Sequence, residues 1–146
     1  MIGVEEEERS GPGERHATPA AAVTAVLTRA FGALPESARA TAPLYVLCGG
    51  YSRFAAHRFT ARCHDSRRLR PSDSIALEAA ELIRPYTTAA GHRGDCYLLD
   101  VEDTAWAALS GALDHGPFVE CRITVTAETL PVPGCLVSAA VRGVPA

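Results

Sequence analysis

The chain has 146 residues, of which 47% are hydrophobic, and a formal net charge of −3. This length and composition are typical of one globular domain with a single core. All 14 basic residues are arginines scattered along the chain, so no basic stripe is present and we expect no nucleic-acid partner. Because the sequence contains no lysine, a Schiff-base nucleophile, a pyridoxal-phosphate anchor and a P-loop lysine are excluded.

The N-terminus is acidic and has no basic segment followed by an apolar one, so we expect a cytoplasmic protein with no membrane association. The five cysteines lack C-x-x-C spacing, which favours buried thiols in a reducing compartment. They are Cys48, Cys63, Cys96, Cys121 and Cys135. A zinc site made of Cys63, His64, His92 and Cys96 is the alternative, but its spacing is unlike that of closed zinc sites, so we expect no metal.

Residues 1–17 contain the acidic run Glu5–Glu8 and few apolar side chains, which predicts a disordered acidic tail. A helix is predicted next, because Thr18 can cap it, Pro19 suits its first turn, and apolar residues follow at helical spacing. The short apolar run Leu44–Cys48 predicts an added edge strand or a buried linker. Residues 18–54 therefore form an N-terminal helix and a linker or edge strand in this interpretation.

Residues 55–130 show the signals of a β-α-β-β-α-β unit. Period-two alternation over 58–64 predicts a strand, Pro71-Ser72-Asp73 predicts the start of a helix, and Arg84-Pro85 predicts its end. Residues 86–92 and 95–101 then predict a hairpin, Asp103 a helix, and residues 118–127 a last strand. This order is typical of the ferredoxin-like α+β fold, a four-stranded antiparallel sheet with both helices on one face.

In that fold the second face of the sheet needs a cover. A sheet of about 70 residues with one bare face is only marginally stable, so we expect a second copy of the chain to cover it. The result would be a homodimer, a dimeric α+β barrel, with residues 131–146 as a C-terminal tail.

Residue parity in the last strand selects the candidate site. Val119, Cys121, Ile123 and Val125 are apolar and share one parity, which predicts that they face the helices and that Glu120 points into the space between sheet and partner. Such a cavity would be apolar with a few convergent polar groups. The candidate ligand-binding residues are Arg122, Arg62, His64, Phe118, Asp100 and His92.

Glu120 is the candidate general base. Burial would raise the pKa of its carboxyl and a nearby Arg122 or Arg62 would lower it, and the sequence leaves that balance open. If burial dominates, proton transfer by Glu120 would contribute about 10²–10⁴-fold in rate. The alternative is a Glu–Arg ion pair on a solvated sheet face, with no catalytic role.

Four segments resemble the second half of muconolactone-isomerase-type proteins. They are Gly91 to Asp103, Leu109-Ser110-Gly111-Ala112-Leu113, Pro117-Phe118-Val119-Glu120 and Ile123-Thr124-Val125. The resemblance covers about residues 57–130 and implies ferredoxin-like chains that associate through their sheets and need no cofactor. A more specific likeness is to the terminal amide synthases of nosiheptide-type thiopeptide pathways, which cleave an enamide extension to leave a C-terminal amide. This likeness implies that Glu120 is the catalytic residue.

We therefore expect a cofactor-free proton-transfer enzyme of secondary metabolism that acts on a small-molecule or modified-peptide substrate. Enamide cleavage in thiopeptide maturation is the first expectation and a muconolactone-type double-bond isomerisation the second. A binding protein without catalytic activity is the third, because fold alone does not specify function. The chain has no G-x-S-x-G, H-E-x-x-H or G-x-G-x-x-G motif, which disfavours other enzyme classes.

Overall fold

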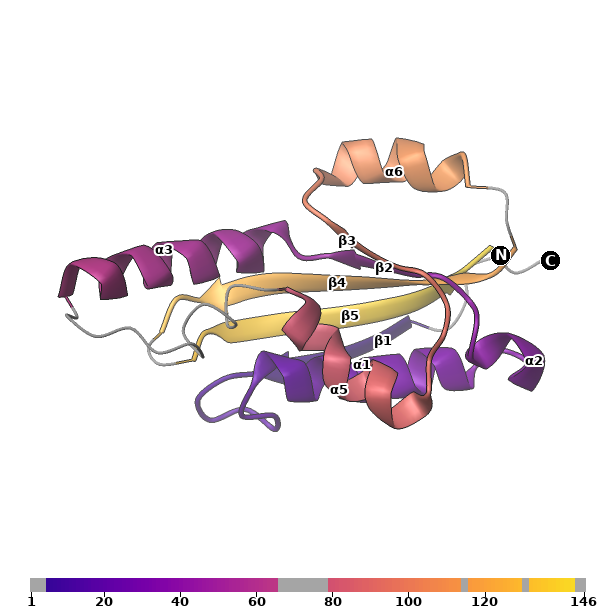
Figure 1. Ribbon diagram of the computed structural model, residues 1–146, viewed down its shortest axis with the longest axis horizontal. Helices are drawn as coiled ribbons and strands as arrows, with labels where there is room; N and C mark the ends of the chain where they lie inside the picture. The colour runs from indigo at the N-terminus through magenta and orange to yellow at the C-terminus, as the bar shows by residue number, and fades with distance from the viewer. Residues whose placement is uncertain (1–4, 66–78, 114–115, 130–131, 144–146) are drawn as a thin grey trace.

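The computed structural model of the protein describes residues 5–65, 79–113, 116–129 and 132–143. The described elements, in chain order, are β1 (Glu5–Ser10), α1 (Pro19–Gly32), α2 (Glu36–Arg39), β2 (Leu44–Leu47), α3 (Gly49–Asp65), α5 (Ala80–Ala90), β3 (Cys96–Leu99), α6 (Asp103–Gly111), β4 (Phe118–Ala127) and β5 (Gly134–Arg142) (Figure 1). None of the helices in these ranges is both long and apolar enough to cross a lipid bilayer.

The five strands form one mixed sheet in the order β1-β5-β4-β2-β3. β2 pairs in parallel with β4 on one side and with β3 on the other, whereas β5 is antiparallel to both β4 and β1. The fold is therefore α+β, but the predicted four-stranded antiparallel ferredoxin-like sheet is not found. Over the described residues the sheet is open, with β1 and β3 at its edges and no closure into a barrel.

Helices lie on both faces of the sheet, whereas the prediction put them on one (Figure 1). α1 and α5 pack together on one face, and α3 and α6 lie on the other. The connections explain this arrangement. α5 lies in the connection from β2 outward to β3, and α6 lies in the connection from β3 back across β2 to β4. Right-handed crossovers in opposite directions place two such helices on opposite faces. α3, which also follows β2, lies on the face of α6.

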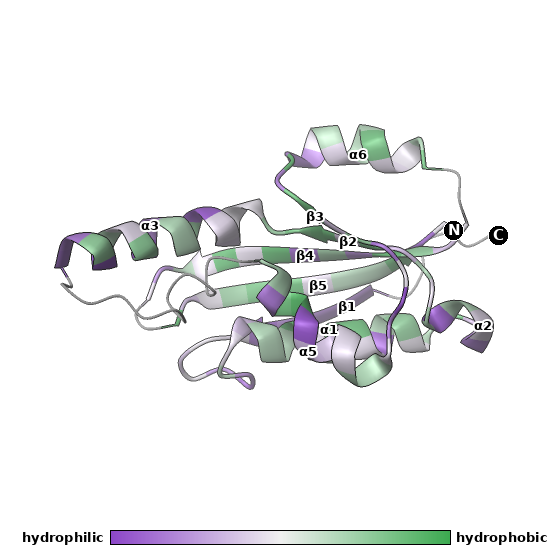
Figure 2. Cartoon of the chain, in the orientation of Figure 1, coloured by the Kyte–Doolittle hydropathy of each residue, from purple (hydrophilic) through white to green (hydrophobic). Residues whose placement is uncertain are grey.

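Each face has its own apolar core. The larger core joins α1 and α5 to the sheet through fully buried side chains such as Leu27, Phe31 and Val119. The smaller core lies under α6 and consists of Tyr45, Leu47, Trp106 and Phe118. Figure 2 shows the apolar stretches along β2 and β4 that supply both. The predicted parity of β4 is confirmed, since Val119, Cys121 and Ile123 belong to the larger core and Phe118 to the smaller one.

The acidic tail is the first correction. Residues 5–10 form strand β1, paired with β5 over six residues, whereas disorder was predicted. Arg29 of α1 makes this possible, because its Nε lies 2.7 Å from Glu6 Oε2 and its Nη1 lies 3.0 Å from Glu8 Oε1. The glutamates of the acidic run therefore point to opposite sides of β1. Glu5 and Glu7 are exposed to solvent, and Glu6 and Glu8 form ion pairs with Arg29.

Two predicted strands are helices. Residues 58–64 lie in the second half of α3, and the predicted domain boundary at residue 55 falls inside this helix. Phe54 is the one described buried residue of α3. The apolar alternation over 58–64 therefore does not correspond to a buried face. Residues 86–90 belong to α5, which passes through Pro85 because Leu82, Ile83 and Tyr86 pack at helical spacing. Gly91, with φ of 62°, ends that helix in the left-handed region that glycine tolerates.

Further predictions differ in detail. The run over 44–48 is strand β2, but it lies inside the sheet instead of at its edge. The predicted C-terminal tail contains β5, whose antiparallel pairing with β4 and β1 gives it an interior position. The strand over 95–101 and the helix from Asp103 are confirmed as β3 and α6, as is the N-terminal helix. The helix start at Pro71-Ser72-Asp73 lies outside the described residues.

The ion pairs under β1 predict a pH dependence. Burial of Glu8 opposes its ionisation, but the hydrogen bond from Arg29 and the charges of Arg15, Arg29 and His16 outweigh it, so the pKa of Glu8 is lowered from its usual 4.5. A carboxyl whose pKa is lowered in the folded state stabilises the fold above pH 4.5. This stabilisation is lost as the pH falls through the folded-state pKa. Urea unfolding from pH 7 to pH 3 should therefore show a steeper loss of stability below pH 4.5 in wild type than in Glu8→Gln. Equal slopes would show that the pairing contributes nothing.

Candidate functional site

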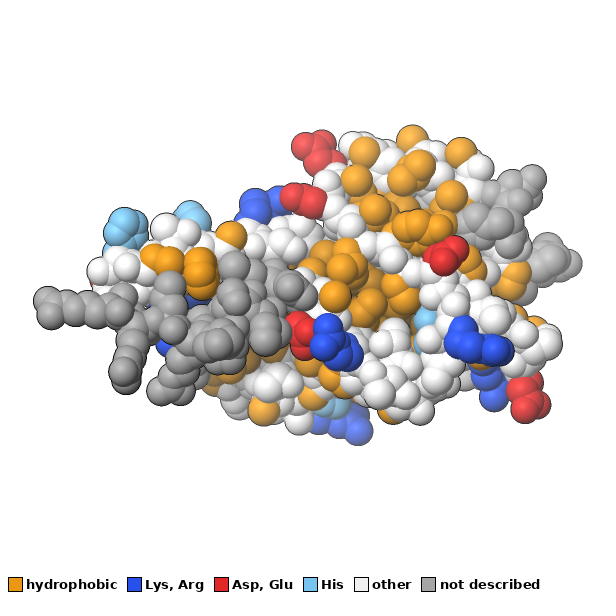
Figure 3. Space-filling view, in the orientation of Figure 1, with side chains coloured by type: hydrophobic (Ala, Val, Ile, Leu, Met, Phe, Trp, Pro, Cys, Tyr) orange, Lys and Arg blue, Asp and Glu red, His pale blue; other side chains and the backbone are white. Residues whose placement is uncertain are grey.

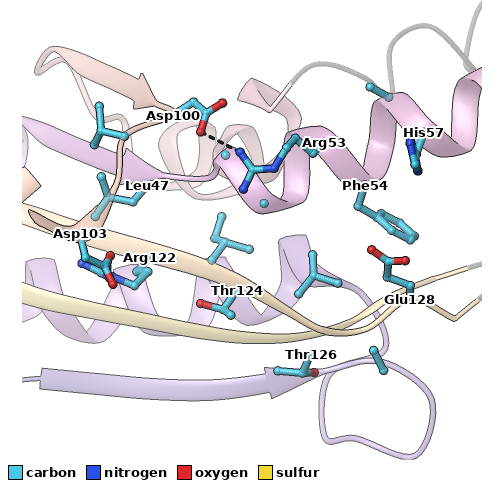
Figure 4. A pocket seen from close by; sticks show the side chains of 17 residues that line it. Leu47, Arg53, Phe54, His57, Asp100, Asp103, Arg122, Thr124, Thr126 and Glu128 are labelled. Atoms are coloured by element: carbon cyan, nitrogen blue, oxygen red, sulfur yellow. Dashed lines mark hydrogen bonds and ion pairs between the residues drawn. The ribbon is translucent and has the colours of Figure 1, made fainter. Parts of the chain in front are cut away.

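An open pocket of about 770 Å³ lies at the carboxyl ends of the three parallel strands (Figure 4). β4 extends five residues beyond the part that pairs with β2, and α3 runs over this extension. The extension, residues 123–127, forms the floor, and the first turns of α3 form the roof (Figure 4). The loop after β3 closes one end of the pocket with Asp100, Val101 and Asp103.

The position of this pocket follows from strand order. After β2 the chain proceeds to β3 on one side, while after β4 it turns to β5 on the other. α3 leaves β2 and runs over the extension of β4, and the hollow lies between them at the carboxyl ends of the strands, where α/β proteins commonly bind ligands. The sheet therefore supplies this hollow through its topology.

Asp100 and the start of α3 are fitted to one another. A Cβ on Gly49 would lie only 1.9 Å from Asp100 Oδ1, so glycine is required for the Asp100 side chain to rest against the helix N-terminus. A carboxylate is favourable there because the amino end of a helix carries partial positive charge. Asp100 Oδ1 also accepts a hydrogen bond from Arg53 Nη1 at 3.1 Å, in a pair that is largely exposed.

A second ion pair crosses the same end of the pocket. Arg122 of β4 donates through Nη1 to Asp103 Oδ1 at the start of α6. Its other terminal nitrogen, Nη2, lies 3.6 Å from Glu120 Oε1. Arg122 therefore links the pocket to the partly buried carboxylate of Glu120, which lies two residues earlier on β4 and next to the smaller core.

Glu120 is held on both of its oxygens. Oε1 accepts a hydrogen bond from Trp106 Nε1 at 2.7 Å, and Oε2 accepts one from Arg142 Nε at 2.9 Å. The Glu120 side chain is only 12% exposed, and Trp106 of α6 in the same chain contacts it. The carboxylate thereby fastens α6 to the sheet at Trp106 and joins β4 to β5. This arrangement matches the ion-pair alternative, except that the pair is shielded from solvent.

The structure separates the predicted site residues into four places. Asp100 and Arg122 line the pocket, whereas Glu120 and Phe118 lie under α6, with Glu120 close to Arg122. Arg62 and His64 lie in the last turn of α3, which extends away from α6 (Figure 1), and they do not line the pocket. They were placed near Glu120 because residues 58–64 were interpreted as a strand of the same sheet.

His92 lies at the opposite end of the parallel strands. Its Nε2 is 2.9 Å from the carbonyl oxygen of Ala42, just before β2, and its ring meets Phe31 edge-on at 5.1 Å. His92 therefore ties the loop after α5 to the start of β2, which is a role in folding. The pocket is formed at the carboxyl ends, so His92 does not belong to it.

Several pocket residues were not predicted from the sequence. Arg53, Phe54, His57 and Glu128 all line it, and Figure 4 shows the Glu128 carboxylate close to the ring of Phe54. The helical spacing of Arg53, Phe54 and His57 directly after Gly49-Gly50 was the available signal. It went unused because a strand was expected to begin at residue 55.

The buried cysteines, Cys48, Cys121 and Cys135, are poor nucleophiles, because burial raises the pKa of each thiol. Burial raises the pKa of Cys121 to about 12, and the neighbouring Cys48 and Glu120 add to the effect. Burial also raises the pKa of Cys48, against hydrogen bonds from Ser52 and Leu99 that lower it. No cysteine lines the pocket, and the described parts of the chain contain no group of three His, Cys, Asp or Glu side chains able to hold a metal ion.

No protein-family model matches this chain, and no curated protein matches it significantly. The function of the protein is therefore inferred from the geometry of the site.

Replacing Glu120 should cost stability. In Glu120→Gln the two arginines lose their charged partner in a shielded place, so we expect a loss of about 2 kcal/mol, as for hydrogen bonds to charged groups. Asp103→Asn breaks an ion pair whose carboxylate is 81% exposed and should lose less than about 1 kcal/mol. Urea unfolding at neutral pH measures both. A Glu120→Gln protein as stable as wild type would show that Glu120 does not fasten α6.

The fit of Gly49 to Asp100 gives a second prediction. Gly49→Ala must displace the Asp100 carboxylate and break its pair with Arg53. Because that side chain is largely exposed and can rotate, we expect a loss of less than about 1 kcal/mol. Gly50→Ala is the matched control, because its Cβ would meet nothing closer than Arg53 Nη2 at 4.0 Å. Alanine is the better helix former, so Gly50→Ala should not reduce stability. Asp100→Gly in the Gly49→Ala background should recover part of the loss, and no recovery would contradict the proposed contact.

Proposed function

We propose that the protein binds a small organic acid with an apolar body in the pocket between α3 and the extension of β4. The observation that carries this proposal is the pocket itself, a hollow of about 770 Å³ at the carboxyl ends of β2, β3 and β4. Its size is in the range of sites that enclose small ligands, which are mostly apolar with a few oriented polar groups.

The lining supports a ligand of mixed character. Leu47, Phe54 and Val101 offer apolar surface, and Thr124 and Thr126 add hydroxyl groups on the floor. Arg53 is the best anchor for a carboxylate, since its side chain is 71% exposed and only its Nη1 bonds to Asp100. A guanidinium has five N–H donors, so the remaining ones can bind a ligand carboxylate in a two-point contact.

The geometry favours binding over proton transfer by Glu120. A general base needs an acceptor oxygen within hydrogen-bond reach of the substrate. Both oxygens of Glu120 are engaged by Trp106 and Arg142, and Glu120 does not line the pocket. Enamide cleavage and double-bond isomerisation on Glu120 stay predictions from the sequence resemblance, and the described residues form a mixed five-stranded sheet in place of the ferredoxin-like sheet that the resemblance implies.

Two probes test the proposal, 4-phenylbutyrate and its neutral amide. Saturation-transfer NMR and titration should show one saturable site for the acid. Thr124→Trp places a large side chain on the exposed pocket floor and should weaken binding of both probes by at least about tenfold, which corresponds to 1.4 kcal/mol. Thr60→Trp, on the exposed far part of α3, is the control and should bind as wild type does.

The arginine has its own test. Arg53→Met should weaken binding of the acid by about tenfold and leave binding of the amide within about twofold of wild type. Only the acid carries a carboxylate for the guanidinium to bind. Thr124→Trp that binds like wild type would place the ligand elsewhere. An Arg53→Met variant that loses acid and amide equally would remove the role of Arg53 as a carboxylate anchor.

A further inference from the structure

β3 is an edge strand of the described sheet, and its outer row of backbone groups has no partner among the described residues. The amides of Leu44 and Cys48 donate to the carbonyls of Asp95 and Leu99 at 2.9 and 3.1 Å, so odd-numbered residues of β3 direct their backbone groups toward β2. The N–H and C=O groups of Cys96 and Leu98 therefore point to the open side. In the described parts of the chain no strand lies beyond β3.

The side chains at this edge are apolar and exposed. Tyr97 is 42% exposed and Leu98 40%, and Val101 and Leu109 of the neighbouring loop and α6 add to the same surface. Figure 3 shows hydrophobic side chains gathered over β3 and α6. A contiguous exposed apolar surface on an edge strand marks a site of strand pairing.

The opposite edge of the sheet is different. β1 exposes the charged side chains of Glu5, Glu7 and Arg9, and Figure 2 shows β1 hydrophilic where β3 is hydrophobic. Charged side chains on an edge discourage pairing with another strand. One edge of the same sheet is thus protected and the other is open.

We propose that β3 is the interface of a homodimer in which two copies pair their β3 edges in an antiparallel manner about a two-fold axis. The axis passes between the two Tyr97 residues, and Cys96 lies opposite the partner's Leu98. This inference concerns the edge of the sheet and does not depend on a ligand in the pocket.

The register follows from the backbone. Two antiparallel strands bond through residues whose groups point outward, which restricts the axis to residue 96, 97 or 98. With the axis at Tyr97, Cys96 of each copy forms backbone hydrogen bonds with Leu98 of the other copy. All of these residues lie within β3. An axis at Cys96 would pair Leu98 with the partner's Gly94. The N–H of Gly94 already donates to the Ala40 carbonyl at 3.2 Å, so it cannot bond to a partner strand. An axis at Leu98 would require Asp100, which lies beyond the strand and pairs with Arg53.

Side chains favour the same register and a second copy as the occupant. Tyr97 stacks on Tyr45 with ring centroids 4.8 Å apart, and Tyr45 meets Phe118 at 5.2 Å. Two Tyr97 rings across the axis would join the aromatic rows of the two copies, and aromatic cross-strand pairs are stabilising. In this register Asp95 lies opposite the partner's Leu99, so no two acidic side chains face each other.

Sedimentation velocity tests the interface. At about 100 μM, wild type should sediment with twice the 15.4 kDa mass of the chain. It should dissociate into monomers on dilution, because a reversible dimer follows mass action. Leu98→Arg places charge at the edge and should be monomeric. Ala61→Arg adds the same charge to the exposed far part of α3 and should remain dimeric. Circular dichroism checks that the variants are folded.

Disulfide trapping tests the register. In a non-hydrogen-bonded antiparallel pair the Cα atoms are about 4.5 Å apart, within the range a disulfide spans. Tyr97→Cys in a Cys63→Ser, Cys96→Ser background should therefore form a covalent dimer on mild oxidation. Leu98→Cys in that background should not, because the two sites are diagonal neighbours about 7–8 Å apart.

Several outcomes would overturn the proposal. They are a wild type that stays monomeric at about 500 μM, a Leu98→Arg variant that dimerises like wild type, and trapping at Leu98→Cys in place of Tyr97→Cys.

Discussion

The parallel pairing of β2 with β4 and β3 is the constraint on which the rest of this structure depends. Parallel neighbours need crossovers, and crossovers that run in opposite directions bring α5 and α6 to opposite faces of the sheet. The same pairing brings three strand ends together beneath α3, where the pocket lies. It also leaves β3 at the edge of the sheet, where its outer backbone groups meet no other described strand.

Charge in this protein is used mainly to join elements. Glu120 connects Trp106 of α6 with Arg142 of β5, and Arg29 connects α1 with two glutamates of β1. Glu8 and Glu120 are both shielded and have several partners, which is the condition under which a shielded ion pair is tolerated. The ion pairs at the pocket, Arg53 with Asp100 and Arg122 with Asp103, are more exposed. Exposed pairs contribute little to stability and can exchange partners with a ligand, which is why the proposed site lies there.

The two proposals concern neighbouring parts of one edge of the fold. Asp100 and Val101 follow β3 directly and line the pocket, so the strand that would pair with a second copy leads straight into the site. Arg53 stands on the other side of that site, at the start of α3. A dimer formed through β3 would hold the loop at Asp100 in place while leaving the roof of the pocket free.

By itself, the sequence determined the elements whose side chains bury one face. The helix capped by Thr18, the strand over 118–127 and its parity follow from apolar spacing, because burial imposes a period on the residues that face a core. Where no face is buried, as over 58–64, alternation carries no information, and the predicted strand is a helix. Only the tertiary structure decided the position of Glu120 under α6, the pairing of the acidic residues of β1, and the pocket between α3 and β4. Each of these depends on which strands are neighbours, and neighbours distant in sequence leave no local pattern in it.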